Sequence, residues 1–504
     1  MIDFPILSLL IWVPILGGVS CLTFGMRSAA KARLIALLTA FITISLCIPL
    51  YTEFDSSSYA MQFVERFSWI KAYGIDYYLG VDGISMPMVI LTTITTLVVI
   101  IASWKPIRSN VAQYMATFLI MQGMMVGVFE ALDSMLFYVF WEGMLIPMYL
   151  CIGIWGGSNR TYASIKFFLY TFLGSVLMLI ALLYMRLKGG SFAILDFYSL
   201  PLSMTEQTLI FIAFLMAFAV KVPMWPVHTW LPDAHTEAPA GGSVVLAALM
   251  LKMGIYGFFR FSMPITPDAC QHLVWLMIGL SLIAVVYIGF VAIIQTDMKR
   301  LIAYSSVAHM GFATLGAFMI YIIIGRTHNY ADAYMSVEGA VVQMISHAFS
   351  TGGMFFGIGI LYDRIHSRMI KDYGGVVNRM PIFTTFFMLF AMANVGLPGT
   401  SGFVGEFMII LSTFKASFWV TFAAASTLIL SASYTLWMFK RVFYGEIKSE
   451  SVAALEDISA SEITVLAILA AVVLFLGVYP EPLLKLLHTS VEHLLILSTH
   501  TKLV

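Results

Sequence analysis

Charged side chains are scarce in this chain of 504 residues, because only 11% of them are Asp, Glu, Lys or Arg while 60% are hydrophobic. A soluble globular protein is about 25% charged and about 45–50% apolar, so too few ionic groups remain to cover a surface in water. The 27 basic and 27 acidic side chains also cancel, which leaves no field to attract nucleic acid. These shortages exclude a soluble enzyme and a nucleic-acid-binding protein, and they predict a polytopic protein of the lipid bilayer.

Cysteine is scarce as well. The 4 cysteines lie far apart inside apolar runs, without a CxxC motif or the spacing of an iron–sulfur site: Cys21, Cys47, Cys151 and Cys270. We therefore expect buried, unpaired cysteines, no metal and no cofactor in this chain. The amino terminus lacks the basic region and the cleavage site of a secretory signal, and it predicts a retained first span.

Long apolar runs dominate the chain. A bilayer core of about 30 Å needs about 20 apolar residues per helix, so we expect an all-α protein of about fourteen transmembrane helices. The predicted spans are 4–25, 31–51, 84–104, 111–130, 133–156, 161–186, 208–230, 241–261, 270–295, 300–324, 336–362, 381–412, 416–440 and 462–480.

Lys and Arg are distributed unequally between the two sets of loops, by roughly 16 to 9. Because cytoplasmic loops carry the excess, we expect both termini on the outer, periplasmic side of a bacterial inner membrane. The longest segment between spans, from Glu53 to Asp82, is rich in aromatic residues and is expected to lie along the outer surface.

Four charged residues fall deep inside predicted spans: Glu142, Lys221, Lys252 and Glu406. A charge at a helix centre costs about 2.5–3.5 kcal/mol on insertion scales, so such residues usually face the bundle interior and mark an ion pathway. Glu142 and Lys221 could alternatively form a structural salt bridge. Lys252 has no obvious carboxylate of its own, and a lysine of this kind can take up or release a proton according to where its partner lies.

Two of these charges lie beside breaks in the helical pattern. Pro223 and Pro226 follow Lys221, and the run GLPGTSGFVG precedes Glu406. Interrupted helices in corresponding positions of two halves point to the ion site of a transporter, although either break alone could be a packing kink. We expect two inverted repeats of five helices, at 111–265 and 266–445, between an amino-terminal unit of three spans (1–110) and a carboxy-terminal span and tail (446–504).

Three histidines are further candidates because imidazole changes its charge near neutral pH: His235, His309 and His347. The last two lie inside spans and beside Ser and Thr hydroxyls, which can hold water. We expect a proton relay, with a structural core histidine as the alternative. Haem ligation would need two histidines that face each other at close range, and the spacing of these histidines in the sequence does not require such a pair.

The segment around the first break resembles a known family signature: FAVKVPMWPVHTWLPDAHTEAPAGGSVVLAALMLK. It is similar to the antiporter-like proton-translocating subunits shared by NADH:quinone oxidoreductase (complex I), related hydrogenases and sodium/proton antiporters, and the resemblance extends over nearly the whole chain. It matches Glu142, Lys221 and Lys252 to the charged residues of the family's fifth, seventh and eighth helices. Most members, including the antiporter proteins, have lysine where this chain has Glu406. A glutamate at this position resembles one of the three antiporter-like subunits of complex I.

The resemblance implies a proton-translocating subunit of complex I, coupled to electron transfer from NADH through FMN and iron–sulfur clusters to quinone in partner subunits. The implied partners are the two other antiporter-like subunits and small membrane subunits. A proton would enter from the cytoplasm near the broken seventh helix, load Lys221, pass Lys252 and the histidines, and leave from Glu406. A sodium/proton antiporter subunit without redox chemistry and a quinone-binding redox subunit are the alternatives.

Overall fold

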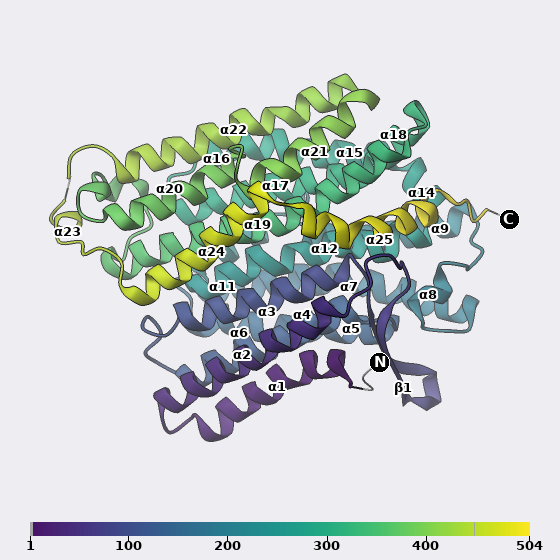
Figure 1. Ribbon diagram of the computed structural model, residues 1–504, viewed down its shortest axis with the longest axis horizontal. Coiled ribbons are helices and arrows are strands. Elements are labelled where there is room, and N and C mark those ends of the chain that lie inside the picture. The colour runs from purple at the N-terminus through teal and green to yellow at the C-terminus, as the bar shows by residue number, and fades with distance from the viewer. Residues whose placement is uncertain (1–3, 448, 504) are drawn as a thin grey trace.

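The computed structural model describes residues 4–447 and 449–503 and consists almost entirely of helices that run along one common direction (Figure 1). Within this part of the chain, thirteen helices are long and apolar enough to cross a membrane. Lipid offers no hydrogen-bond partners to the backbone, and a helix pairs its own N–H and C=O groups internally. The predicted all-α membrane fold is therefore confirmed, and the twelfth predicted span, 381–412, is a pair of shorter helices.

The first half of the chain contains α1 to α13. The bounds are α1 Ile6–Phe24, α2 Ala29–Thr52, α3 Ser85–Ala102, α4 Val111–Glu130, α5 Ser134–Gly143, α6 Leu145–Trp155, α7 Arg160–Gly189, α8 Ile194–Phe197, α9 Met204–Lys221, α10 Trp230–Glu237, α11 Ala240–Val245, α12 Leu251–Gly257 and α13 Met263–Ile265. Two π-helical segments, Leu246–Met250 and Phe258–Ser262, join α11, α12 and α13 into one continuous helix.

The second half contains α14 to α25. The bounds are α14 Pro267–His272, α15 Val274–Leu282, α16 Ile288–Ile293, α17 Met298–Phe318, α18 Ile320–Thr327, α19 Tyr330–Ile365, α20 Pro381–Val395, α21 Ser401–Ala416, α22 Phe418–Phe443, α23 Glu450–Ala453, α24 Ala460–Val478 and α25 Glu481–Thr499. A π-helical segment, Ile283–Tyr287, joins α15 to α16, and short 3-10 turns follow α19 at Ile370–Asp372 and Val376–Asn378.

Both predicted helix breaks are present. The helix α9 ends at Lys221, earlier than the predicted end at 230, because Pro223 and Pro226 supply no backbone donors, and α10 begins only at Trp230. The helix α20 ends at Val395, where Gly396 adopts φ +83°, and α21 begins at Ser401. Each break leaves backbone groups without helical partners at membrane depth, which is tolerated where protein or water surrounds them.

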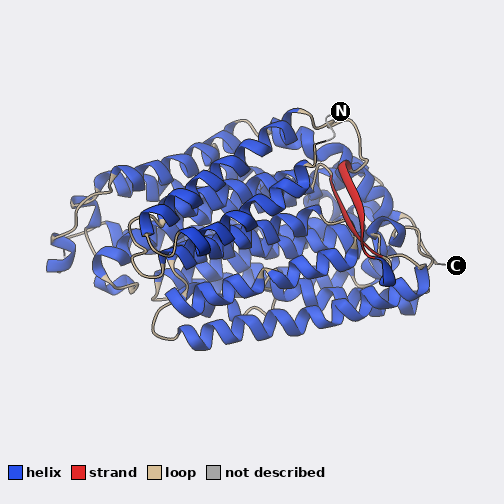
Figure 2. Cartoon of the chain, turned by 90° about the horizontal axis from the view of Figure 1, so that it is seen from below, coloured by secondary structure: helices blue, strands red, loops and turns tan. Residues whose placement is uncertain are grey.

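The end of the bundle that carries both termini also carries a β-hairpin (Figure 2). Strands β1 (Gln62–Ile70) and β2 (Ile75–Val81) pair antiparallel, and Gly74 turns the chain at φ +68°. The hairpin lies within the segment predicted as the outer loop, whose strand structure the sequence analysis did not anticipate. The tail after α24 forms the helix α25, also not anticipated, and Ser490 Oγ of this helix accepts a hydrogen bond of 2.8 Å from Gly83 N.

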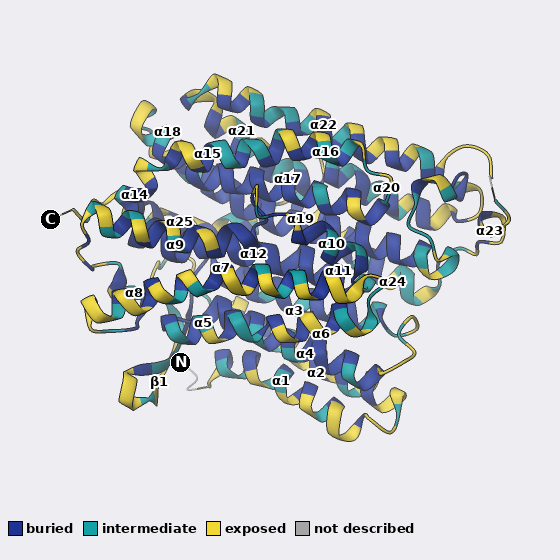
Figure 3. Ribbon diagram, turned by 180° about the vertical axis from the view of Figure 1, so that it is seen from behind, coloured by how far each residue is buried: buried dark blue, intermediate teal, exposed yellow. Residues whose placement is uncertain are grey.

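The most deeply buried helices form the middle of the bundle (Figure 3). They are the continuous helix Ala240–Ile265, α17 and α19. The helices α1, α2, α7 and α24 are more exposed, as expected for surfaces that face lipid or partner chains. All four cysteines are buried, as predicted. Three of the candidate proton-carrying residues, Lys252, His309 and His347, therefore lie on helices that other helices surround.

Candidate functional site

A lysine and a histidine meet in the middle of the bundle. Lys252, on α12, is fully buried, and its Nζ lies 2.7 Å from Nδ1 of His347 on α19. The same amine also donates to the carbonyl oxygen of Ala247 at 2.5 Å. An ammonium group can donate to an unprotonated Nδ1, and a protonated Nδ1 can donate to a neutral amine. One proton can therefore be shared between the two side chains without breaking the contact.

The polar chain continues from His347 to the second helix break. The rings of His347 and His309 are 5.7 Å apart, and Nδ1 of His309 lies 3.0 Å from Oε1 of Glu406. Gln343 Nε2 donates to the same carboxylate oxygen at 3.2 Å. The buried residues Lys252, His347, His309, Gln343 and Glu406 form what we call the central relay. They come from four helices, α12, α17, α19 and α21.

Small residues let the helices of the central relay approach closely. A Cβ atom added to Gly405 on α21 would lie 2.7 Å from the backbone nitrogen of Gln343. A Cβ atom added to Gly339 on α19 would lie 2.9 Å from Met408 Cβ. Because α19 and α21 are in contact at these two positions, the carboxylate of Glu406 in the second turn of α21 can reach both Gln343 and His309.

Glu142, which is partly buried, and the fully buried Lys221 belong to a second site. In the described part of the chain they form no ion pair within 4.0 Å, so the alternative of a tight structural salt bridge is not what the structure contains. Lys221 Nζ instead lies 5.1 Å from the centre of the Trp141 ring, at cation–π distance. Lys221 Nζ and Glu142 Oε1 have no hydrogen-bond partner in the described structure. Buried polar groups normally have partners, and water can supply them in such a site.

His235 lies apart from the central relay. Its ring is fully buried and stacks on Phe355 with the centroids 4.5 Å apart, and neither ring nitrogen has a hydrogen-bond partner in the described structure. Of the seven predicted site residues, the structure thus joins four in the central relay and leaves His235 separate. It places Lys221 beside Trp141, the residue next to Glu142 in the sequence.

Several buried charges were missed by the sequence analysis, because they lie near the ends of spans and read as loop residues. Arg260 pairs with Asp82 at 2.8 Å, and Glu338 contacts His488 at 2.7 Å. Lys299 is buried and donates to the carbonyl oxygen of Ala238 at 2.7 Å. Glu130 is fully buried, and both its carboxylate oxygens lack a partner in the described structure. Only tertiary contacts reveal these groups as interior.

The helix that carries Lys252 is locally irregular. A π-helical segment precedes it at Leu246–Met250 and another follows at Phe258–Ser262. Insertions of this kind are rare and frequently occur at functional sites. They change the rotation of the helix on both sides of Lys252, and they free carbonyl groups such as that of Ala247, to which the lysine donates.

Comparisons with known proteins agree with this architecture. Residues 131–431 match the family model described as the transmembrane region of NADH:quinone oxidoreductase and Mrp antiporters, and residues 28–129 match the amino terminus of NADH-ubiquinone oxidoreductase chain 4. The first match covers more than half of the chain. The fold and the buried line of ionisable residues thus define an antiporter-like membrane subunit.

The chain belongs to the NADH:quinone oxidoreductase/Mrp antiporter family. It is 47% identical to NADH-quinone oxidoreductase subunit M of Rhodobacter capsulatus, over 93% of this chain and 91% of the relative. It is 40% identical to NADH-ubiquinone oxidoreductase chain 4 of Marchantia polymorpha, over 97% of this chain and 96% of the relative.

Solved structures show the same fold. A chain of respiratory complex I from Thermus thermophilus superposes with a TM-score of 0.88 at 29% identity, over 98% of this chain and all of that chain. A chain of the Mrp complex from Dietzia sp. DQ12-45-1b superposes with a TM-score of 0.81 at 21% identity, over 96% of this chain and 52% of that chain. Because its sequence identity is low, the similarity to the Mrp chain shows a common fold and nothing further.

Proposed function

We propose that this chain is a proton-translocating membrane subunit of NADH:quinone oxidoreductase. Relatives that carry the names subunit M and chain 4 align with it over nearly its whole length. The single observation that carries the proton-translocating role is the central relay, a buried line of ionisable side chains from Lys252 to Glu406. Charges buried in a membrane bundle are costly and mark ion pathways by default.

The chain itself holds no redox centre in this proposal. The described residues contain no group of three or more His, Cys, Asp or Glu that could hold a metal ion. NADH, FMN, the iron–sulfur clusters and quinone then bind in partner subunits, which include two other antiporter-like subunits and small membrane subunits. The complex lies in a bacterial inner membrane, with both termini of this chain on the periplasmic side and the opposite end of the bundle facing the cytoplasm.

The central relay supplies a route along the middle of the membrane. A proton on Lys252 passes to His347, whose Nδ1 is 2.7 Å away. It crosses the 5.7 Å between the rings of His347 and His309 through an intervening water, and from His309 it reaches Glu406 at 3.0 Å. Glu142 and Lys221 form a separate proton site whose affinity depends on the distance between them. Glu406 is the point of departure toward the periplasm.

The energies involved are modest. Moving one proton against 100 mV takes about 2.3 kcal/mol, and a hydrogen bond to a charged group contributes about 1.5–3 kcal/mol. Making or breaking one or two such bonds along the central relay is therefore enough to change which residue holds the proton.

The two helix breaks support the proposed inverted repeats at 111–265 and 266–445. Each repeat contains one break beside a buried charge, at Lys221 and at Glu406. The two flanking units, 1–110 and 446–504, contribute the β-hairpin and α25 at the end with both termini. An antiporter subunit without redox chemistry is disfavoured, because the full-length relatives are oxidoreductase subunits.

The proposal is tested in inverted membrane vesicles that carry the full complex. NADH oxidation and acidification of the vesicle interior are measured together for Lys252→Ala and Lys221→Ala. We expect each variant to lower proton transport by at least about tenfold, since a positioned proton-transfer group contributes about 10²–10⁴-fold. Lys371→Ala is the matched control, because Lys371 is exposed at the opposite end from the termini. Wild-type proton transport in both variants would refute the proposal.

A further inference from the structure

A cavity of about 220 Å³ lies at the end of the bundle that carries both termini, and we call it the outer cavity. Its walls come from the segments on either side of the β-hairpin, from the end of α8, from the π-helical segment Phe258–Ser262 and from α25. Tyr59, which lines it, is 57% exposed, so the outer cavity reaches the surface of the chain. Two buried charged residues, Asp82 and Arg260, also form part of its wall.

The guanidinium of Arg260 is held in place by several contacts. One of its nitrogens lies 2.8 Å from Oδ2 of Asp82, and its Nε donates to the hydroxyl of Tyr256 at 3.2 Å. The hydroxyl of Tyr198 donates to the carbonyl oxygen of Arg260 at 3.0 Å. The other oxygen of Asp82 accepts from the backbone nitrogen of Ser85 at 2.9 Å. The guanidinium therefore has a fixed position between the outer cavity and Tyr256.

Arg260 lies on the same continuous helix as Lys252, nearer to the end with the termini. Lys252, Tyr256 and Arg260 follow one another at intervals of four residues, and side chains with this spacing lie on one face of a helix. The hydrogen bond between Arg260 and Tyr256 keeps this alignment into the π-helical segment. All three residues are buried. A line of polar side chains thus leads from the outer cavity toward Lys252.

Arginine is the one basic side chain in this line that cannot pass a proton on. A guanidinium group is not deprotonated in proteins, so it has no free nitrogen that could accept a proton. Its positive charge repels a proton that approaches, and this repulsion is stronger in a protein interior than in water. An arginine beside a water-filled pore can exclude protons in this way.

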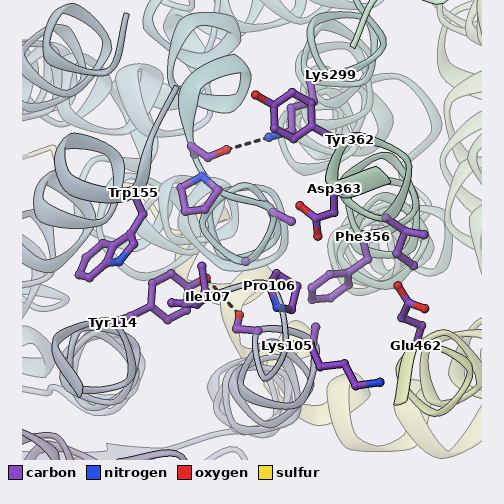
Figure 4. A pocket seen from close by; sticks show the side chains of 18 of the residues that line it. Lys105, Pro106, Ile107, Tyr114, Trp155, Lys299, Phe356, Tyr362, Asp363 and Glu462 are labelled. Carbon is purple, nitrogen blue, oxygen red and sulfur yellow. Dashed lines mark hydrogen bonds between the residues drawn. The ribbon is translucent and has the colours of Figure 1, made fainter. Parts of the chain in front are cut away.

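The cavity at the opposite end of the bundle has a different lining. Its volume is about 410 Å³, and Figure 4 shows Lys299 and Asp363 among its side chains. An amine and a carboxylate can both gain and lose a proton. In the outer cavity, by contrast, the carboxylate of Asp82 is paired with a guanidinium, which cannot. The two ends of the bundle therefore present different chemistry to a proton.

We propose that Arg260 is a proton barrier, which closes the outer end of the helix that carries Lys252 and keeps periplasmic protons from returning to this lysine. The inference rests on the function and orientation proposed above. Asp82 and Tyr256 hold the guanidinium in the barrier position. The route outward then runs through Glu406, at the other end of the central relay, and not along the helix of Lys252.

Neutral substitution of the ion pair tests the barrier. Arg260→Gln combined with Asp82→Asn leaves two amides and no unpaired buried charge, so we expect the complex to assemble. Inverted vesicles are energised with NADH, an inhibitor of quinone reduction is added, and the loss of acidity from the vesicle interior is followed. The decay in vesicles without the complex is subtracted. We expect this decay to be at least about tenfold faster than in the wild type, because a fixed charge changes the local concentration of an ion by about 10–10³-fold.

Three comparisons make the result specific. Asp82→Asn alone keeps the guanidinium, so its decay shows what loss of the ion pair does by itself, and we expect the double variant to exceed it. Arg66→Gln removes an arginine that is 53% exposed on the β-hairpin and should decay like the wild type. Lys252→Ala added to the double variant should slow the decay again, because the returning proton must reach Lys252.

A second neutral pair, Arg260→Met with Asp82→Asn, keeps the test independent of how well one pair assembles. NADH oxidation in the presence of an uncoupler should match the wild type in both double variants, since electron transfer takes place in partner subunits. A faster decay with normal oxidation is a leak of protons. A merely structural role of Arg260 would instead lower assembly and oxidation together, without a leak.

The outcomes separate this inference from the proposed function. Equal decay in the double variants and in Asp82→Asn would overturn the barrier, and so would a fast decay that persists after Lys252→Ala is added. If Lys252→Ala alone abolishes proton transport while the double variants hold their gradient like the wild type, the central relay stands and the barrier is wrong. If Lys252→Ala alone transports protons like the wild type, the proposed function itself fails.

Discussion

The side chains of Lys252 and His347 come from helices 95 residues apart in the sequence and meet at 2.7 Å in the buried middle of the bundle. Lysine and imidazole are both basic, and two positive charges in contact repel each other. The contact is therefore stable only while at least one of the two groups is neutral. In the proposed function, such a pair passes a proton onward when a third group accepts it, and His309 and Glu406 are the next ionisable groups.

Removal of the imidazole should interrupt this transfer. We expect His347→Phe to lower proton transport by at least about tenfold, because the ring volume stays while the proton-binding nitrogen is lost. Transport in inverted vesicles, measured against NADH oxidation, checks the prediction. His272→Phe is the control, since His272 is exposed on α14. Equal transport by both variants would show that His347 only packs.

The carboxyl group of Glu406, at the end of the central relay, should be needed because it can take up and release a proton. Glu406→Gln keeps an oxygen that can accept from Gln343 but cannot take up a proton. We expect assembly to be retained and proton transport to fall by at least about tenfold. Glu456→Gln, at an exposed position, should leave transport unchanged. A glutamine variant that transports protons at the wild-type rate would remove Glu406 from the path.

The contact between α19 and α21 should not tolerate a methyl group at its closest point. A Cβ atom on Gly405 would lie 2.7 Å from the backbone nitrogen of Gln343, and backbone atoms cannot move aside easily. Overpacking of this kind costs about 1–3 kcal/mol. We expect Gly405→Ala to lower both the thermal stability of the complex and proton transport.

The matched variant is Gly325→Ala, where nothing lies within 4 Å of an added Cβ atom on α18. Alanine is about 1 kcal/mol more favourable than glycine within a helix, so this variant should be as stable as the wild type or slightly more stable. Thermal denaturation of the purified complex compares the two. Equal stability of both variants would contradict the close contact at Gly405.

The buried ion pair between Asp82 and Arg260 should hold the β-hairpin end of the bundle together. Breaking such a pair by removing one partner costs about 3–5 kcal/mol, and we expect Asp82→Asn to destabilise the chain by about this amount. Asp76→Asn is the control, because Asp76 pairs with the largely exposed Arg66 and exposed pairs contribute about 0–1 kcal/mol. Thermal denaturation at pH 7 measures both, and similar losses in the two variants would contradict the prediction.

The same pair should make stability depend on pH. Burial alone would raise the pKa of Asp82, but the Arg260 guanidinium and hydrogen bonds from Ser85 hold that pKa below its usual value of 3.8. A lowered pKa means that this stabilisation is complete above the usual value and is lost as the pH falls through the pKa of the folded state. We expect the stability difference between wild type and Asp82→Asn to shrink in that acidic range, and a constant difference would contradict it.

Local sequence patterns were enough to predict the membrane fold. An apolar run of the right length must become a helix in lipid, whatever its neighbours are, so the predicted spans correspond to helices in the structure. The breaks after Lys221 and before Glu406 were also predictable, because proline and glycine act on the backbone locally. The strands of the β-hairpin and the helix α25 were not predicted, since both depend on packing against distant segments.

The sequence by itself thus determined the all-α membrane architecture, the two interrupted helices and the candidate residues at Glu142, Lys221, Lys252 and Glu406. Only the tertiary structure decided which of these residues meet. It gave Lys252 a histidine as its partner and placed Trp141 beside Lys221. It also buried Lys299, whose amine donates to the carbonyl oxygen of Ala238. The physical reason is that insertion into lipid depends on the composition of each segment, whereas the contacts of a buried charge depend on helices that are far apart along the chain.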